Sequence, residues 1–447
     1  MNRLLARLVI AAAVLCWAPS VWAVTITPIV GESGVTAWLA EDHSVPVVTL
    51  RFAFPGGATY DPPGKGGTAS MVAATLDEGS GPYDTTEFHT RLENLATRLS
   101  FSAGQDEFGG SMRMLKRNVG ESAELLRLSL TDPHFTPEDI ERIRAEIVAI
   151  LQRQARNPRS LSSRLWMHTA FEAHPYGANT DGTEASVAAI TRDDLVAFAQ
   201  RRIQRKGLVL AVVGDITATE AAALIDHVFG GLPSREGAPQ IPEAEPADAG
   251  ALIVSRSPVP QSVVTFGQSG IKRADPDWYA ALVLNDVLGG GGFRGRLMQE
   301  IREKRGLAYG VSTELVPYRH AGLVLGSVAT ENARVRESIE LVRAEWKRMR
   351  EDGPSEAELQ RAKTYLTGSF PLGLDSTQHV AAVLLQMQLD GLGADYLDRR
   401  ADLINGVTLE QARRVAKRLY DPDRLSFVVV GNPADVTPIE PPRPANR

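Results

Sequence analysis

The sequence predicts an α+β protein with two homologous domains, each a mainly antiparallel sheet covered by helices, joined by a linker. Within each half, strands come in neighbouring runs and helices follow, an order typical of α+β domains and not of a doubly wound parallel sheet. The chain has 447 residues, of which 43% are hydrophobic, enough for two sizeable cores. The strongest reason for two homologous domains is that the same landmarks occur twice, in the same order.

These landmarks are strands, helix starts and glycine-ended runs at matching places in the two halves. Each half opens with a short alternating strand, at Val48–Phe52 and Val263–Phe266. Each half closes with a β-rich run that ends in glycine, at Val212–Asp215 and Val429–Asn432. Ser or Thr followed three residues later by an acid or amide is typical of a helix start. Such starts are expected at Thr136 and Thr191 in the first half and at Ser355 and Thr408 in the second.

The segment between the halves has the composition of a linker. Residues 232–250 contain Pro233, Pro239, Pro242 and Pro246 among acidic residues, and proline at this density disfavours both helix and sheet. We therefore expect one domain at residues 24–231 and a second at residues 251–447.

The first 23 residues have the features of a secretory signal peptide. Arg3 and Arg7 precede an apolar run at Leu8–Trp17, and a small-residue cleavage site ends at Ala23. The run is too short to span a bilayer, so we expect no membrane span in the mature chain. The lone cysteine, Cys16, lies inside this segment, so the mature chain has no disulfide or thiol chemistry. The prediction is an exported, periplasmic protein cleaved after about Ala23.

The charge balance argues against a nucleic-acid partner. The formal net charge is −6, and without Arg3 and Arg7 it becomes 46 − 54 = −8. Proteins that bind nucleic acid carry a basic patch or stripe, and no run of basic residues stands out in this sequence.

The segment Gly67–Ala74 carries the clearest functional signal. It follows a strand and a turn, and it resembles the helix of the insulinase/pitrilysin metallopeptidases on which G-x-A-H-x-x-E-H supplies two zinc ligands and a general base. When Gly67 is aligned with the family's glycine, Ser70 and Ala74 stand at the histidine positions and Ala73 at the glutamate position. None of these side chains can perform the family's chemistry.

The family's third zinc ligand is a glutamate on a later helix, shortly before an Asn/Asp-Pro pair. Here that helix is expected at residues 137–155, followed by Asn157-Pro158. The ligand position then falls on Ile150, and Glu146 would match only if the alignment slipped by a turn. The resemblance therefore implies that this chain holds no metal, and the other histidines are scattered along the sequence without a ligand pattern.

A glycine-rich segment, Leu288–Phe293, precedes a predicted helix that runs to about Arg305. Phe293, Leu297, Met298 and Ile301 recur at helical spacing and predict the buried face of this helix. Glycines can surround a phosphate, but no G-K-[ST] follows, so we favour a turn that allows close packing or the passage of a peptide.

Arg302 and Tyr309 match the family's C-terminal R-x-x-x-x-x-x-Y motif. In active relatives, as the resemblance implies, this Arg and Tyr bind the substrate carbonyl and stabilise the oxyanion of the tetrahedral intermediate. Without the motif, Arg302 would be an ordinary solvated residue of a helix and Tyr309 a half-buried residue of a strand.

The resemblance implies two insulinase-type α/β-roll domains and the role of a subunit without zinc, similar to the non-catalytic subunit of mitochondrial processing peptidase. Its partner would be a zinc-bearing insulinase-family subunit in a heterodimer, and exposed strand edges would bind extended peptides by β-augmentation. One alternative is a non-catalytic peptide-binding or scaffold protein. A weaker one is an independent hydrolase that uses Ser70, although the sequence has no G-x-S-x-G motif.

Overall fold

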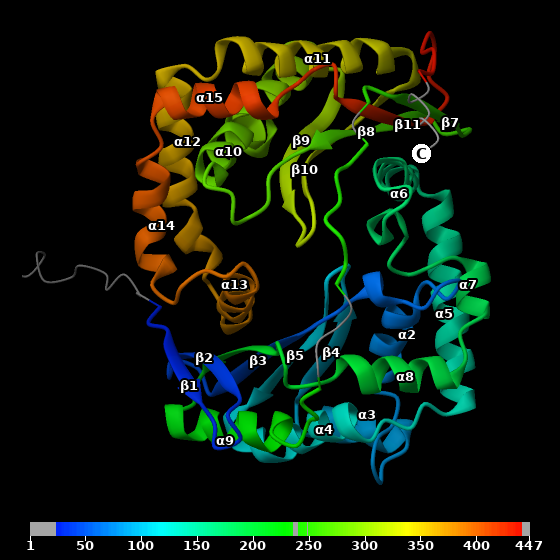
Figure 1. Cartoon of the computed structure of the whole chain (residues 1–447), viewed down its shortest axis with the longest axis vertical. Coiled ribbons are helices and arrows are strands. Elements are labelled where there is room, and N and C mark those ends of the chain that lie inside the picture. The colour runs from blue at the N-terminus through cyan, green and yellow to red at the C-terminus, as the bar shows by residue number, and fades with distance from the viewer. Residues whose placement is uncertain (1–23, 236–239, 248, 440–447) are drawn as a thin grey trace, which may run out of the picture.

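The structure is a computed structural model that describes residues 24–235, 240–247 and 249–439. The expected signal peptide, residues 1–23, lies outside the described residues, as do residues 236–239 and 248 of the expected linker. The described chain forms two halves, each with one sheet and its own helices (Figure 1). The α+β prediction with two domains is therefore confirmed. Within the described ranges, no helix is long and apolar enough to cross a bilayer.

The first sheet has six strands in the order β1-β2-β6-β3-β5-β4. Only the β2–β6 pair is parallel, and the other neighbours are antiparallel. The strands are β1 (Thr27–Val30), β2 (Thr36–Glu41), β3 (Val47–Pro55), β4 (Arg98–Ala103), β5 (Glu107–Leu115) and β6 (Val209–Gly214).

Six helices of the first half, α2, α4, α5, α7, α8 and α9, contribute to one hydrophobic core with this sheet. The helices are α2 (Thr68–Thr75), α3 (Thr85–Asn94), α4 (Val119–Thr131), α5 (Pro137–Arg156), α6 (Pro158–Ala170), α7 (Glu184–Ala188), α8 (Arg192–Arg202) and α9 (Ala218–Phe229), with short 3-10 turns at Ala58–Tyr60, Lys116–Asn118 and Pro175–Gly177.

The second sheet has five strands in the order β7-β11-β8-β10-β9. Again one pair, β7–β11, is parallel and the others are antiparallel. The strands are β7 (Leu252–Arg256), β8 (Gln261–Ser269), β9 (Ala308–Pro317), β10 (Gly322–Glu331) and β11 (Ser426–Gly431).

The second core is formed mainly by this sheet with α10, α11, α12 and α15. The α-helices are α10 (Trp278–Asn285), α11 (Val335–Asp352), α12 (Glu356–Gly368), α13 (Thr377–Leu389), α14 (Tyr396–Asn405) and α15 (Leu409–Leu419). Two π-helical segments, η4 (Asp286–Gly290) and η6 (Met298–Glu303), flank the 3-10 turn η5 (Gly292–Arg294), and further 3-10 turns are η7 (Asn332–Arg334) and η8 (Phe370–Gly373).

The structure also confirms the matching landmarks. Strands β6 and β11 occupy equivalent places, and each ends in the glycine that the sequence repeats. At Gly214 a Cβ would overlap the carbonyl oxygen of Val47, and at Gly431 it would overlap Ser262. The four expected helix starts are N-caps, and those at Thr191, Ser355 and Thr408 form capping boxes.

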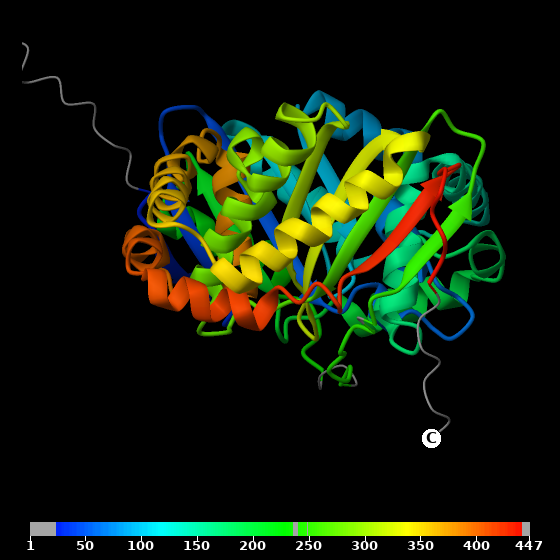
Figure 2. The same cartoon turned by 90° about the horizontal axis from the view of Figure 1, so that it is seen from above.

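One helix of each half packs on the sheet of the other half. Helix α6 packs on β8 and β11, and α13 packs on β3 and β6. These two helices lie on opposite sides of the molecule, between the sheets (Figure 1), and the view from above shows the two halves superposed (Figure 2). Ser162 on α6 hydrogen-bonds to Thr265 at 2.8 Å, and Thr377 on α13 hydrogen-bonds to Thr49 at 2.9 Å. This reciprocal packing fixes one half against the other.

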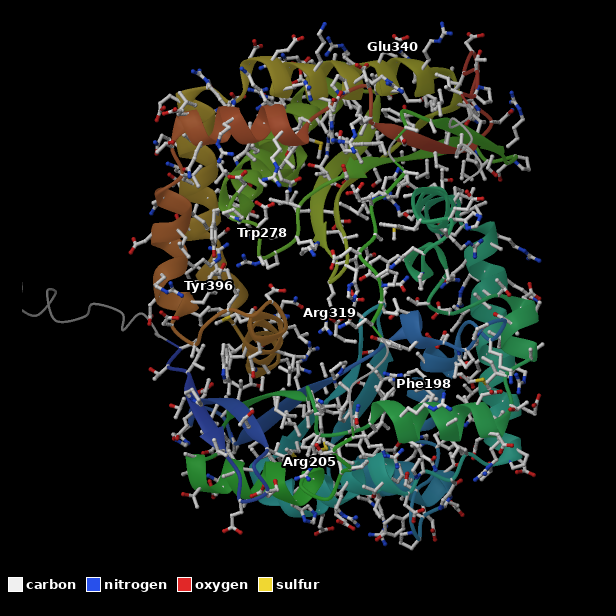
Figure 3. All side chains as sticks on the ribbon, in the orientation of Figure 1. Phe198, Arg205, Trp278, Arg319, Glu340 and Tyr396 are labelled. Atoms are coloured by element: carbon white, nitrogen blue, oxygen red, sulfur yellow. The ribbon has the colours of Figure 1, made fainter. Side chains whose placement is uncertain are left out.

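A buried polar contact adds a third connection, where Figure 3 places Arg319 between the halves. The Tyr176 hydroxyl donates to the two carboxylate oxygens of Asp106 at 2.7 and 2.9 Å. The backbone N–H of Arg319, from the β9–β10 hairpin, donates to Asp106 at 3.0 Å. The N–H of His320 donates to the Tyr176 hydroxyl oxygen, also at 3.0 Å. Burial and the Asp106 carboxylate raise the pKa of the Tyr176 phenol, which remains protonated.

Candidate functional site

The four positions expected to replace a zinc site lie on two packed helices of the first half. Ser70, Ala73 and Ala74 are on α2, Ile150 is on α5, and these helices are in contact. Zinc in proteins takes Cys, His, Asp or Glu ligands, and none of these types stands at the four positions. Within the part of the chain that the structure describes, no group of three or more such residues is placed to hold a metal ion.

A polar network occupies the space beside Ser70. The Ser70 hydroxyl lies within hydrogen-bond distance of the Thr180 carbonyl oxygen, at 2.9 Å, and of the Asp181 carboxylate, at 3.2 Å. Gln154 on α5 donates to the other oxygen of Asp181 at 3.2 Å. The Asp181 carboxylate therefore connects α2 to α5. Because the Ser70 hydroxyl donates to these acceptors and no imidazole lies among its partners in the described chain, the geometry does not support Ser70 as a nucleophile.

The loop that carries Asp181 packs tightly against the start of α2. Gly182 has a φ of 74°, and a Cβ there would overlap the carbonyl oxygen of Gly66. A close backbone approach of this kind requires glycine. The loop thus holds Asp181 between the two helices.

Asp61 holds the N-terminus of α2 in place. Its carboxylate accepts hydrogen bonds from the backbone N–H of Gly67 at 2.7 Å and of Ala69 at 2.8 Å, which are donors that the first turn of a helix leaves unpaired. Burial raises the pKa of Asp61 to about 6, although these hydrogen bonds act in the opposite direction.

Glu146, which could serve as a ligand only after a slip in the alignment, interacts elsewhere. Its side chain is 58% exposed and pairs with Arg142 at 3.2 Å. Ile150, one turn later, is 36% exposed. Glu146 makes no contact with Ser70 among the hydrogen bonds and ion pairs of the described residues, so these two residues do not form a metal site.

Arg302 and Tyr309 lie together in the second half, at the end of η6 and the start of β9. The Arg302 guanidinium donates to the backbone oxygen of Tyr309 at 2.8 Å. Its central carbon lies 4.6 Å from the ring centroid of Tyr309 and 4.6 Å from that of Phe293. The Tyr309 residue is 87% exposed. The arrangement therefore places an exposed phenol beside a half-buried guanidinium, which two rings and an ion pair with Glu303 at 3.6 Å hold in place.

The expected helix before Arg302 is confirmed for three of its four apolar positions. Leu297, Met298 and Ile301 are buried, but Phe293 is 61% exposed, so the prediction of Phe293 as a core residue is wrong. Phe293 lies in the 3-10 turn that precedes the helix, so it does not share the helical phase, and its ring lies against Arg302.

The glycine-rich segment packs closely against β9, as the preferred interpretation expects. A Cβ on Gly289 would come within 2.7 Å of the Thr313 hydroxyl oxygen. The expected turn is only partly formed, because Leu288–Gly290 belong to the π-helical segment η4. The later segment η6 is also π-helical, and π-helical turns are frequent at functional sites.

Sequence reasoning missed Asp181, Asp106 and the role of Tyr176. The segment His174–Gly177 forms a tight turn, but the partner of the Tyr176 hydroxyl is 70 residues away along the chain. Asp181 stands in an Asn-Thr-Asp-Gly segment typical of a turn. Nothing in that segment indicates which helices the carboxylate joins.

Two sequence models of one family match adjoining parts of the chain. The model described as "Insulinase (Peptidase family M16)" matches residues 36–184. The model described as "Peptidase M16 inactive domain" matches residues 189–366.

Among curated proteins, the chain is similar to the non-peptidase homolog YmxG of Helicobacter pylori, with 25% identity over 404 residues that cover 90% of this chain and 93% of the relative. It is 26% identical over 375 residues to an uncharacterized zinc protease of Mycobacterium leprae, covering 79% of this chain and 84% of that protein. It is also 23% identical over 419 residues to the probable mitochondrial-processing peptidase subunit beta of Schizosaccharomyces pombe, covering 90% of each chain.

Solved structures show the same fold. A peptidase M16 inactive domain from Pseudomonas fluorescens superposes with a TM-score of 0.86 at 28% identity, covering 93% of this chain and 100% of that one. A protease from Helicobacter pylori superposes with a TM-score of 0.83 at 17% identity, covering 92% and 100% of the two chains.

Proposed function

The chain belongs to the peptidase M16 (insulinase) family, and on that premise we propose that it is the subunit without zinc of a two-chain metallopeptidase. In this proposal it binds extended peptides and supplies Arg302 and Tyr309 to the zinc site of a partner subunit of the same family. The proposal includes export to the periplasm, with residues 1–23 removed after about Ala23.

The observation that carries the proposal is the contrast between the two candidate sites. At the first, the residues do not fit a zinc ion, since Ser70, Ala73, Ala74 and Ile150 offer no ligand set and Asp181 is hydrogen-bonded to both helices. At the second, the Tyr309 ring is 87% exposed beside the Arg302 guanidinium. A residue with that exposure contributes little to the core, so its position favours a role toward something outside this chain.

The chemistry of the pair suits an oxyanion. A guanidinium and a phenol are hydrogen-bond donors, and donors fixed in advance stabilise negative charge that develops on a substrate carbonyl. The hydrogen bond from Arg302 to the Tyr309 backbone and the two ring contacts restrict the guanidinium before substrate arrives. The partner's metal would supply the Lewis acid when the two chains associate.

Two strand edges are available for an extended peptide. Strand β4 ends the first sheet and β9, which begins with Ala308 and Tyr309, ends the second. A peptide that adds to a sheet edge is held by main-chain hydrogen bonds, so this mode favours unfolded segments over folded proteins.

Cleavage in a reconstituted complex tests the proposal. The mature chain is measured alone and then mixed with a zinc-bearing family member from the same cell, with zinc content and the cleavage of an unfolded peptide recorded. We expect no cleavage by the chain alone and cleavage by the mixture. Tyr309→Phe keeps the ring over Arg302 but removes the hydroxyl, and loss of one such donor costs on the order of a hundredfold in kcat.

Tyr365→Phe is the matched control, because Tyr365 is a partly exposed tyrosine of the same half whose ring also lies against an arginine, Arg294. It should leave kcat unchanged. Cleavage by the isolated chain, or an unchanged kcat for Tyr309→Phe in an assembled complex, would contradict the proposal.

A second candidate function is a non-catalytic peptide-binding or scaffold protein. The similarity to a Helicobacter pylori protein named as a non-peptidase homolog favours it. In that case the Tyr309→Phe and Arg302→Gln variants would bind partner and peptide normally and would leave the partner's cleavage rate unchanged.

A further inference from the structure

The inner face of the first sheet, toward the second half, carries a row of arginines near its free edge. Arg98 on β4 and Arg113 on β5 are directly opposite cross-strand partners, and Thr49 on β3 is the partner of Arg113 on its other side. Arg51, two residues beyond Thr49 on β3, points to the same face. The three guanidinium groups therefore share one side of three adjacent strands.

These arginines have no acidic partner among the described residues, although several other arginines of the chain do. In the second half, for example, Asp277 pairs with both Arg414 and Arg418. Within the described ranges, the side chains of Arg98 and Arg113 take part in no ion pair or hydrogen bond, and the Nε atom of Arg51 is buried without a hydrogen-bond partner. Like charges directly opposite each other in a sheet are destabilising. An acidic group placed beside them would remove that cost.

A groove gives access to Arg98 and Arg113. A cavity of 490 Å³ lies along α3, β4 and β5 and includes Arg98, Arg113 and Gln378 in its walls. A second cavity of 440 Å³, beside the start of α13, shares Arg113 and Gln378 with the first. The two cavities therefore meet at Arg113, and together they run from the free edge of β4 across the inner face of the sheet.

Acidic residues also line the groove, and none of them pairs with the arginines. Glu41 lies 3.2 Å from His43, and Asp375 lies 2.6 Å from His379. Burial raises the pKa of Asp77 to about 6, and the charged groups that act on it most are Glu78, His89 and Arg142. Asp42 and Glu93 complete the acidic residues of the walls.

The edge of β4 determines how a ligand would meet these arginines. No strand of the described chain pairs with its outer side, and alternate residues Arg98, Ser100 and Ser102 are exposed on the inner face. A peptide added as a seventh strand would place every second side chain on that same face, next to these residues. The side chain opposite Arg98 would continue the row Thr49, Arg113, Arg98.

We propose that the first half selects extended peptides with Asp or Glu side chains, which pair with Arg98 and Arg113 when the peptide adds to the edge of β4. This inference rests on the proposed peptide-binding function and adds the chemical class of the peptide. Charge complementarity at Arg98 and Arg113 favours an acidic side chain at the peptide position beside them and disfavours a basic one.

The test uses the full mature chain and three fluorescent peptides with the same Thr/Val backbone, in which every fourth residue is Glu, Gln or Lys. Every peptide is made with a free and with an amidated C-terminus, and dissociation constants are measured by anisotropy. We expect the Glu peptide to bind at least tenfold more tightly than the Gln peptide, with a preference that falls as salt rises and survives amidation.

Arg98→Gln and Arg113→Gln should each reduce the Glu preference while leaving the affinity for the Gln peptide unchanged. Arg117→Gln is the matched control, since Arg117 is exposed in the same half and lines neither cavity, and it should keep the full preference. Equal affinities for the Glu and Gln peptides would overturn the proposed selection of acidic peptides but would still agree with the proposed peptide binding. Failure of all three peptides to bind would overturn both proposals, and a preference that vanishes on amidation would overturn the assignment to side chains.

Discussion

The two halves share the order of five strands and differ in the helix that comes after the long central strand of each sheet. In the first half, β3 leads to α2, a regular helix whose polar position, Ser70, is hydrogen-bonded to the neighbouring loop. In the second half, β8 leads to α10, which continues directly into the π-helical segment η4. After the turn η5, the π-helical segment η6 carries Arg302, and Tyr309 follows at the start of β9. The polar side chain of the first helix is hydrogen-bonded within its own half, whereas the second helical region leads to a half-buried guanidinium beside an exposed phenol.

This difference teaches that duplicated architecture does not duplicate chemistry. Both helices belong to the core of their own half, so the fold needs both. The residues able to act on a substrate carbonyl are found after only one of them. Fold and function are therefore separable within one chain.

Restoring the zinc ligands would test the comparison most severely. A variant with Ser70→His, Ala73→Glu, Ala74→His and Ile150→Glu should bind zinc on the order of a thousandfold or more tightly than the unmodified chain, because two packed helices would again present three ligands. The zinc bound per chain after dialysis against buffers of known free zinc concentration measures this affinity. If the variant folds and holds no zinc, the spacing of α2 and α5, and not only their residues, separates this half from a metal site.

Helices α6 and α13 allow a comparison of the two reciprocal contacts. Trp166 on α6 is 2% exposed and Leu384 on α13 is 0% exposed. Trp166→Ala should lower the free energy of unfolding by about 3–5 kcal/mol and Leu384→Ala by about 2–5 kcal/mol. Urea denaturation measures both. A cost below about 1 kcal/mol for either variant would show that its helix does not hold the halves together.

The pH dependence of stability should reveal equivalent acids in the two halves. Burial raises the pKa of Asp77, just after α2, and of Asp286, just after α10, each from 3.8 to about 6. Because the folded state binds these protons more tightly, the free energy of unfolding falls as pH rises from about 4 to 6.

Asp77→Asn should therefore stabilise the protein by about 2 kcal/mol at pH 8, with no gain at pH 3. Asp286→Asn should give a gain of similar size, because burial raises the pKa of Asp286 to the same value despite the nearby Arg294. Thermal unfolding at both pH values measures the difference. A gain at pH 3 as large as at pH 8 would rule out titration as the cause.

The smallest effects are expected at the matched helix caps. Thr191 and Thr408 form capping boxes at equivalent helices, α8 and α15. Replacement by Ala should cost about 1 kcal/mol in each half. Urea denaturation of the two variants, with Thr→Ser as the control that keeps the hydroxyl, provides the measurement. If the two losses of unfolding free energy differ severalfold, the two helices are equivalent in backbone position but not in the contribution of their caps.

Much of the fold was predictable because its signals are local. The caps at Thr136, Thr191, Ser355 and Thr408 and the buried Leu297, Met298 and Ile301 depend on a few neighbouring residues. Phe293 was not predictable from periodicity, because a 3-10 turn shifts it out of the helical phase. Asp181 was missed because its partners, Ser70 and Gln154, are distant along the chain.

The sequence by itself determined which chemistry is missing at Ser70, Ala73, Ala74 and Ile150, because the type of side chain alone decides whether a zinc ligand exists. It also determined the duplication, since the landmarks recur along the chain. Only the tertiary structure decided that α6 packs on the second sheet and α13 on the first. The same holds for the pairing of Arg98 with Arg113 across two strands. Strand register and long-range contacts arise from packing of the whole chain, and no local pattern records them.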